Sequence, residues 1–206
     1  MKRVLDRNQD KAEEIRRLLA DKNVRMYNLI SSPGAGKTTL LEQTCRQLMG
    51  SMRVGIIEGD VYTDRDAQRL KQYGFPIVLI NTEGGCHLDS NSIERALKEF
   101  DLDTMDVLFV ENVGNLVCPS HFDLGETAKI AVVSTSEGDD KPIKYPMLFR
   151  DARAVILNKI DLLEHTNFNY DAFLRDLRQV NPTVPLFETS CTRGEGLAGW
   201  YAWLRE

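Results

Sequence analysis

The sequence has few cysteines, no long apolar run and no excess of positive charge. Four scattered cysteines, Cys45, Cys86, Cys118 and Cys191, do not form the disulfide framework of a small secreted protein, so their thiols are free to bind metal in a reducing cytosol. No apolar segment approaches the roughly 18 residues that cross a bilayer, and the first residues lack the apolar core of a secretory signal. With a net charge of −5, the 206 residues have no broad attraction for nucleic acid or anionic membrane. These absences predict a cytoplasmic protein that works on neither a membrane nor a nucleic acid.

Short apolar segments alternate with helical patterns along most of the chain. The predicted strands are Met26–Ser31, Val54–Glu58, Pro76–Ile80, Val107–Val110, Ile130–Ser134, Ala154–Leu157 and Val184–Phe187. Helical patterns occupy Thr38–Leu48, Asp89–Glu99 and Tyr170–Val180, and an amphipathic pattern over residues 3–22 precedes the first strand. The alternation predicts an α/β fold, in which a mostly parallel sheet is covered by helices on both faces. In such sheets ligands bind at the carboxyl ends of the strands.

The first predicted strand runs directly into a phosphate-binding pattern. Residues 31–38 read Ser-Ser-Pro-Gly-Ala-Gly-Lys-Thr, which matches G-x-x-x-x-G-K-[ST] except that Ser31 replaces the first glycine. A loop of this kind turns successive N–H groups toward phosphates at a helix N-terminus. We expect Lys37 to reach the β and γ phosphates and the Thr38 hydroxyl to hold Mg²⁺. The predicted phosphate-binding residues are Gly34, Ala35, Gly36, Lys37, Thr38 and Thr39.

Two carboxylates follow strands where a magnesium–nucleotide complex needs them. Asp60 comes after the second predicted strand, and Glu111 ends the apolar run 107–110 as in a Walker B strand. Each taken alone could be a capping carboxylate. Because Mg²⁺ keeps several waters and needs only one or two carboxylates, we predict Asp60 and Glu111 as its ligands, directly or through water. Lys37, Asp60 and Glu111 are the predicted catalytic groups.

A four-residue element after the sixth predicted strand is typical of guanine recognition. Residues 158–161 read Asn-Lys-Ile-Asp, the N-K-x-D element of GTPases. We expect Asp161 to accept from N1–H and the 2-amino group of guanine, Lys159 to lie along the base, and Asn158 to tie the element to the P-loop. Ser190 and Cys191, after the seventh strand, are predicted to contact the base as well. The predicted bound species are GTP and GDP with Mg²⁺.

Two further loops carry a possible transition-metal site. Cys86 and His87 follow the third predicted strand, and Cys118 follows Glu111 by seven residues. Two thiolates and an imidazole suit Zn²⁺ or Ni²⁺, and the residues alone do not choose between these metals. Three ligands leave one position for water or a second subunit. Unrelated structural thiols are the alternative, and His121 is a weaker candidate for a further ligand.

Three stretches together resemble one protein family. They are Thr82-Glu83-Gly84-Gly85-Cys86-His87-Leu88-Asp89, Glu111-Asn112-Val113-Gly114-Asn115-Leu116-Val117-Cys118-Pro119 and Ser136-Glu137-Gly138-Asp139-Asp140-Lys141-Pro142. The chain resembles the hydrogenase maturation GTPases called HypB, of the SIMIBI class of P-loop GTPases, over essentially its whole length. The family also begins its P-loop with Ser-Ser-Pro-Gly, as this chain does at Ser31.

The resemblance implies a GTP-dependent homodimer that acts as a nickel metallochaperone. It would deliver nickel to the hydrogenase large-subunit precursor with a HypA-type accessory protein, using Cys86, His87 and Cys118 as its metal site. Slow GTP hydrolysis is expected from the residues, because nothing after Glu111 resembles a water-orienting glutamine and no arginine finger is identifiable. The chain length and the lack of an interdomain linker predict a single P-loop GTPase domain over residues 1–206, with an N-terminal helix in 1–23 and the G domain in 24–206.

Other functions stay open at this point. A urease-type nickel GTPase usually has Cys-Pro-His, whereas Cys86 and His87 are adjacent here. A P-loop small-molecule kinase with structural Cys and His residues would transfer phosphate to an acceptor, and a metal-storage module would not hydrolyse GTP.

The remaining notable side chains are interpreted as structural. Cys45 is expected in the core, Cys191 as a small residue of the base loop, and His165 on the surface. An aromatic face of the last helix, formed by Trp200, Tyr201 and Trp203, is also expected to pack in the core.

Overall fold

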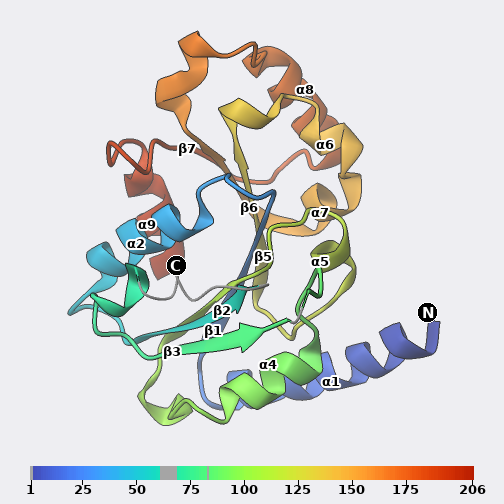
Figure 1. The fold of residues 1–206 in the computed structure, drawn as a ribbon, viewed down its shortest axis with the longest axis vertical. Coiled ribbons are helices and arrows are strands. Elements are labelled where there is room, and N and C mark those ends of the chain that lie inside the picture. Colours follow the sequence, from blue (N-terminus) through green and yellow to red (C-terminus); the bar gives the residue numbers. More distant parts are fainter. Residues whose placement is uncertain (1, 61–68, 83) are drawn as a thin grey trace.

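Seven parallel strands form one sheet, and helices cover both of its faces (Figure 1). The computed structural model describes residues 2–60, 69–82 and 84–206, with only the backbone of residues 2–4 and 60. The strands are β1 (Arg25–Ser31), β2 (Val54–Asp60), β3 (Ile77–Asn81), β4 (Val107–Glu111), β5 (Ala128–Ser134), β6 (Ala152–Asn158) and β7 (Leu186–Glu188). Their order across the sheet is β3-β2-β4-β1-β5-β6-β7. The predicted α/β fold class is confirmed.

The helices follow the strands in the alternation that the sequence predicts. They are α1 (Lys2–Asp21), α2 (Lys37–Leu48), α4 (Ser90–Leu97), α5 (Cys118–His121), α6 (Lys141–Lys144), α7 (Pro146–Asp151), α8 (Tyr170–Val180) and α9 (Leu197–Arg205). Short 3₁₀ segments lie at η1 (Leu102–Thr104), η2 (Thr135–Glu137) and η3 (Ile160–His165). The leading helix and α8 have nearly the predicted bounds, whereas β7 begins two residues later than predicted, beyond Pro185.

Alternate side chains of each strand enter opposite cores. On β1, Tyr27 and Leu29 pack with α2 and α9, whereas Met26 and Ile30 face the helices on the other side. That other side is covered by α1 and α4 at one end and by α7 and α8 at the other, as Figure 1 shows. Because successive side chains of a strand point to opposite faces, a buried parallel sheet needs this apolar content on both.

The last helix joins the core through its aromatic residues. Trp200 is fully buried and its indole N–H donates to Thr44 Oγ1 of α2 at 2.9 Å. Trp203 stacks on Trp200 with ring centroids 5.5 Å apart, and Tyr201 is partly buried against the same core. Cys45 is buried in this core as well. The predictions that these residues are structural are therefore confirmed.

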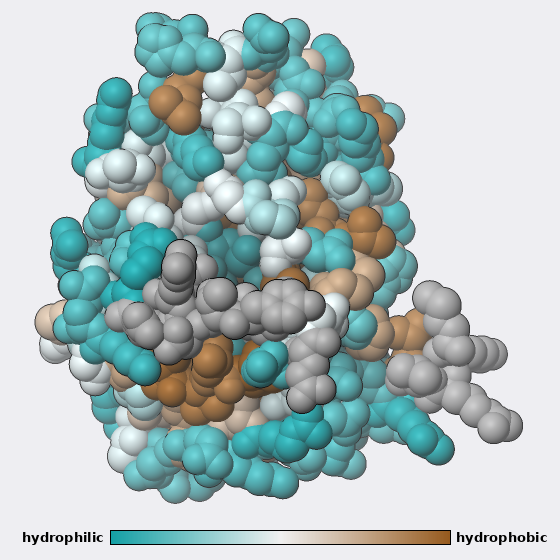
Figure 2. Space-filling model, in the orientation of Figure 1, coloured by the Kyte–Doolittle hydropathy of each residue, from teal (hydrophilic) through white to brown (hydrophobic). Residues whose placement is uncertain are grey.

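The strand β3, at one edge of the sheet, is more exposed than the central strands. The outer surface beside β3 carries apolar side chains on an otherwise mainly polar face (Figure 2). Leu79 of β3 is 42% exposed, while β1, β4 and β5 are almost wholly buried. The loops that follow β1 and β4 therefore leave from strands that are packed on both faces.

Candidate functional site

The phosphate-binding pattern forms a tight loop between β1 and α2. Gly34 and Gly36 have φ of +79° and +98°, a backbone conformation that glycine adopts without strain. The Lys37 ammonium is buried and donates to Ser31 Oγ at 2.8 Å, and the Ser31 hydroxyl donates to the carbonyl of Ser32. Ser31, in the place of the usual first glycine, thus fixes the lysine that the pattern predicts to contact phosphate.

A cleft of about 540 Å³ lies in front of this loop. Its lining combines the loop with the carboxyl ends of β2 and β4 and one residue from the base side: Pro33, Gly34, Gly36, Lys37, Thr38, Thr39, Glu58, Gly59, Arg69, Glu111, Asn112, Val113, Gly114 and Lys159. In folds of this kind nucleotides bind in the crevice at the carboxyl ends of the parallel strands. The cleft therefore places most of the predicted phosphate-binding residues around one volume.

Two carboxylates are buried at the phosphate end of the cleft. Glu111 Oε1 accepts a hydrogen bond from the Thr38 hydroxyl at 2.7 Å, so two predicted Mg²⁺ ligands are in contact. Glu58, which sequence reasoning passed over, is paired in register with Glu111 and is 3% exposed. The side chain of Asp60, the other predicted carboxylate, lies outside the described residues. Buried carboxylate oxygens beside a threonine hydroxyl are a donor set that fits Mg²⁺.

The predicted base-recognition element lies at the end of β6, next to the P-loop. The Asn158 amide donates to the carbonyl of Ala35 at 2.9 Å, which is the predicted tie between the two motifs. Its Oδ1 accepts from the backbone N–H of Cys191 at 3.1 Å, so the β7 loop joins the same cluster. A hydrogen bond from Ser190 and the nearby Arg193 guanidinium hold the pKa of the Asp161 carboxyl below its ordinary value. The carboxylate is therefore ionised at neutral pH, as an acceptor for guanine must be.

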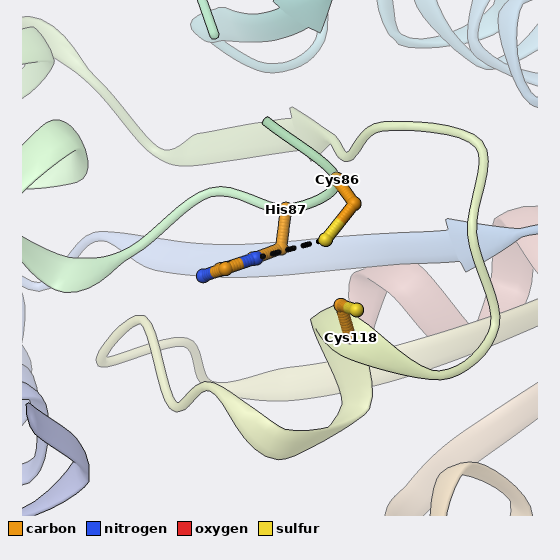
Figure 3. Close-up of side chains that lie close together, drawn as sticks. All are labelled: Cys86, His87 and Cys118. Carbon is orange, nitrogen blue, oxygen red and sulfur yellow. Dashed lines mark hydrogen bonds between the residues drawn. The ribbon is translucent and has the colours of Figure 1, made fainter. Parts of the chain in front are cut away.

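The predicted metal ligands come together from two loops. The ligand atoms of Cys86, His87 and Cys118 all lie within 4.8 Å of one another. Figure 3 shows the Cys86 sulfur directed toward Cys118, with the His87 ring beside it and Nδ1 at 3.5 Å from the Cys86 sulfur. His121, the weaker candidate, is exposed at the end of α5 and is not in this group.

The surroundings of His87 and Cys86 set the protonation of these two side chains. Burial lowers the pKa of the His87 imidazole, which favours the neutral ring that ligates metals. A hydrogen bond with Cys118 and burial raise the pKa of the Cys86 thiol, so a metal has to displace its proton on binding. A set of two sulfurs and one imidazole nitrogen fits Ni²⁺ or Zn²⁺ and is unsuited to Mg²⁺ or Ca²⁺.

Besides Glu58, the phosphate cleft contains Arg69, which the sequence did not predict as a site residue. Arg69 lines the cleft, donates to Thr39 Oγ1 at 3.2 Å and forms an ion pair with Glu42 of α2 at 2.7 Å. No motif of the sequence marks this arginine.

Among the described residues, no helix is long and apolar enough to cross a membrane.

Comparison with known proteins relates the chain to one family of nucleotide-binding proteins. Residues 25–188 match the family described as CobW/HypB/UreG, nucleotide-binding domain. The hydrogenase maturation factor HypB of Escherichia coli K12 is 47% identical over 201 residues, covering 98% of this chain and 69% of that protein. The chain thus spans 69% of the length of this relative and 66% of the length of HypB from Azotobacter chroococcum mcd 1.

Two solved structures have nearly the same fold. The crystal structure of HypB from Archaeoglobus fulgidus superposes with a TM-score of 0.91 at 35% identity, covering 97% of this chain and 98% of that one. The structure of HypB from Helicobacter pylori in complex with nickel gives 0.90 at 38% identity, covering 97% and 94%.

Proposed function

Because the chain belongs to the CobW/HypB/UreG family of nucleotide-binding proteins, we propose that it is a GTP-hydrolysing nickel metallochaperone for hydrogenase maturation. Its partners are the hydrogenase large-subunit precursor and a HypA-type accessory protein in the cytoplasm. The observation that carries the proposal is a cluster of two thiols and an imidazole, joined by one seven-residue stretch to a carboxylate in the phosphate cleft.

The nucleotide is GTP, held at its two ends by different loops. Asp161 pairs with the N1–H and 2-amino donors of guanine, and its lowered pKa supports this acceptor role. Lys159 lies along the base, and Ser190 and Cys191 complete the base loop. Residues 34–39 surround the phosphates, whose negative charge is favoured at the N-terminus of α2.

Residues of the cleft hold Mg²⁺ and promote hydrolysis. Thr38 and Glu111 are its ligands, directly or through water, with Asp60 as the further candidate and Glu58 beside them. When bound, the ion neutralises charge that develops on the phosphates. Lys37 adds a positive charge at the β and γ phosphates, and hydrolysis proceeds slowly without a partner protein.

Nickel is the cargo, carried by Cys86, His87 and Cys118. Three ligands from one chain leave a coordination position for water or for a second subunit, which supports a homodimeric carrier. The same ligands accept Zn²⁺, because affinity alone separates the two metals poorly. The relative from Helicobacter pylori, whose structure contains nickel, supports nickel as the cargo.

Hydrolysis and metal binding are coupled through the stretch from Glu111 to Cys118. Glu111 senses Mg²⁺ and the γ-phosphate, and Cys118 ligates the metal seven residues later. Loops ordered by a γ-phosphate are a common switch in GTPases. Couplings of about 1–3 kcal/mol between sites correspond to roughly 5- to 150-fold changes in metal affinity.

The test is a titration of Ni²⁺, in competition with Zn²⁺, in the GDP state and in the state of a non-hydrolysable GTP analogue. Wild-type affinities should differ between the states. Cys118→Ala should weaken metal binding and remove the difference while leaving GDP affinity nearly unchanged, and His121→Ala, on the same short helix, is the matched control. Superimposable wild-type titrations would show two independent sites, and phosphate transfer to a small acceptor would favour a kinase.

A further inference from the structure

We propose that Asn112 and Asn115 are positioning residues that clamp the metal-ligand loop 84–88 onto the stretch 111–118. This inference rests on the proposed function, because it concerns how the nucleotide and metal sites communicate. The clamp makes the three metal ligands respond to the phosphate cleft as one unit.

Asn112 joins the two loops from inside the protein. It follows Glu111 directly and is only 2% exposed. Its side-chain Oδ1 accepts from the backbone N–H of Leu88 at 3.3 Å and from that of Val113 at 3.0 Å. Leu88 is the residue after the metal ligand His87. One buried amide therefore fixes the start of one metal-ligand loop to the end of the other.

The same amide is anchored in the centre of the sheet. Asn112 Nδ2 donates to Asn28 Oδ1 at 3.1 Å, and Asn28 is a fully buried residue of β1. The Asn28 amide donates in turn to Glu126 Oε1 at 3.4 Å, while Glu126 Oε2 accepts from the N–H of Leu124 at 2.6 Å. Removing one member would leave buried polar atoms without partners, which is costly. Asn112 is therefore a fixed pivot.

Asn115 makes the second connection, close to the surface. Its Nδ2 donates to the carbonyl of Cys86 at 3.3 Å, and its Oδ1 accepts from the N–H of Val117 at 2.9 Å. The second bond is a local Asx turn, which shapes the backbone immediately before Cys118. Asn115 thus connects the backbone of Cys86 to the turn that precedes Cys118.

A third contact supports the imidazole. The ring of Phe122, one residue beyond α5, stacks on the His87 ring with centroids 3.8 Å apart. The same chain segment therefore contacts both Cys86 and His87 while carrying Cys118 itself.

The far end of this stretch contacts the P-loop helix. Glu111 accepts from the Thr38 hydroxyl at 2.7 Å, so a change in the Mg²⁺ and phosphate environment acts on Glu111 first. With Asn112 fixed, the movable part begins at Val113, which itself lines the phosphate cleft, and Asn115 carries the carbonyl of Cys86 with it. Without the clamp, Cys118 would move alone and open the site. With it, the site changes shape but keeps its three ligands.

Amide hydrogen exchange measured without any metal tests the clamp directly. Wild-type protein is compared in GDP–Mg²⁺ and in Mg²⁺ with a non-hydrolysable GTP analogue, and exchange is followed in peptides that cover residues 84–88. Protection of these amides should differ between the two states, although the loop lies outside the nucleotide cleft. Asn115→Asp keeps the acceptor for Val117, replaces the donor to Cys86 with a carboxylate oxygen and adds a negative charge, and Asn115→Ala removes donor and acceptor without adding charge.

Both Asn115 variants should speed exchange in residues 84–88 by roughly two- to tenfold, as expected for one lost hydrogen bond. They should also bring the ratio between the two nucleotide states close to one. Asn167→Ala, an exposed asparagine before α8, should retain the wild-type ratio. Asn112→Ala is the more severe change and could fail to fold, so the Asn115 variants decide the question.

Two results would overturn the clamp: wild-type protection that does not respond to the nucleotide, or a full response that survives in both Asn115 variants. Because no metal is present, these results are independent of the nickel proposal. That proposal fails separately, if the wild-type protein binds neither Ni²⁺ nor Zn²⁺ in the titration described above.

Discussion

Replacing Gly36 with alanine should damage this protein far more than the same change at Gly34. Both glycines have positive φ, but a Cβ at Gly34 would meet nothing within 4 Å, whereas one at Gly36 would lie 2.4 Å from Nδ2 of Asn158. That side chain makes three hydrogen bonds, to the carbonyl of Ala35 at 2.9 Å and from Cys191 N–H and Thr189 Oγ1 at 3.1 and 3.3 Å. The alanine methyl group therefore displaces the residue that joins the P-loop to the base loop.

The expected magnitude follows from these contacts. The left-handed backbone costs about 1–2 kcal/mol for a residue with a Cβ, and this is the whole cost at Gly34. At Gly36 the three hydrogen bonds are lost as well, at about 0.5–1.5 kcal/mol each. Gly36→Ala should thus lower the free energy of unfolding by about 2.5–6.5 kcal/mol, a large part of the roughly 5–15 kcal/mol of a typical domain.

Urea unfolding of the nucleotide-free protein measures both variants, and binding of a fluorescent GDP measures the effect on the site. The double variant Gly36→Ala/Asn158→Ala identifies the cause. Once Asn158 is truncated, alanine at Gly36 should cost only its backbone strain, so the two changes should be non-additive by about 1.5–4.5 kcal/mol. Equal losses for Gly34→Ala and Gly36→Ala, or strict additivity in the double variant, would refute the reasoning.

Three further outcomes are expected. Asp161→Asn should weaken the binding of GTP and strengthen the binding of xanthosine triphosphate, because xanthine has a carbonyl where guanine has its amino group. Competition calorimetry with both nucleotides measures the two affinities, and an unchanged preference would show that Asp161 does not recognise the base. The rate of GTP turnover without a partner protein, measured as released phosphate, should lie within roughly ten- to a hundredfold of the ~10⁻⁴–10⁻³ s⁻¹ of small GTPases. Lys37→Ala should abolish this turnover, and a wild-type rate of many turnovers per second would contradict the prediction. Iodoacetamide at mildly alkaline pH should modify Cys86, which is exposed, and Cys118, which is half-buried. It should not modify Cys45, which is buried and whose thiol pKa is raised by burial to about 12. Excess Ni²⁺ should protect the two reactive thiols in a mass-spectrometric count, and unprotected labelling would argue against their role as ligands.

The sequence predicts the strands and the two nucleotide motifs well because local chemistry determines them. An apolar run that leads into a P-loop pattern and then a helical pattern is typical of a strand and a phosphate-binding turn, and a tie from Asn158 to the P-loop was expected from the motifs. The grouping of Cys86, His87 and Cys118 was implied by the family resemblance, whereas the residues alone left unrelated structural thiols as an alternative.

Other features depend on packing that the sequence does not display. The position of Glu58 beside Glu111 is set by the register of β2 against β4, and a strand pattern carries no register. The short helix α5, which begins at Cys118, has four residues and cannot show a helical period. The ion pair that brings Arg69 to the cleft joins positions 27 residues apart.

The pairing of Trp200 with Thr44 gives the molecule a built-in optical reporter. The sequence has only two tryptophans, and both lie on α9, stacked at 5.5 Å with an interplanar angle of 17°. The buried indole is hydrogen-bonded to the same helix that begins with Lys37 and Thr38. The tryptophan emission of the protein therefore originates at one spot, on the helix that packs against α2. We expect nucleotide exchange to change this emission and so to be measurable without a dye, whereas the metal-ligand loops contain no tryptophan.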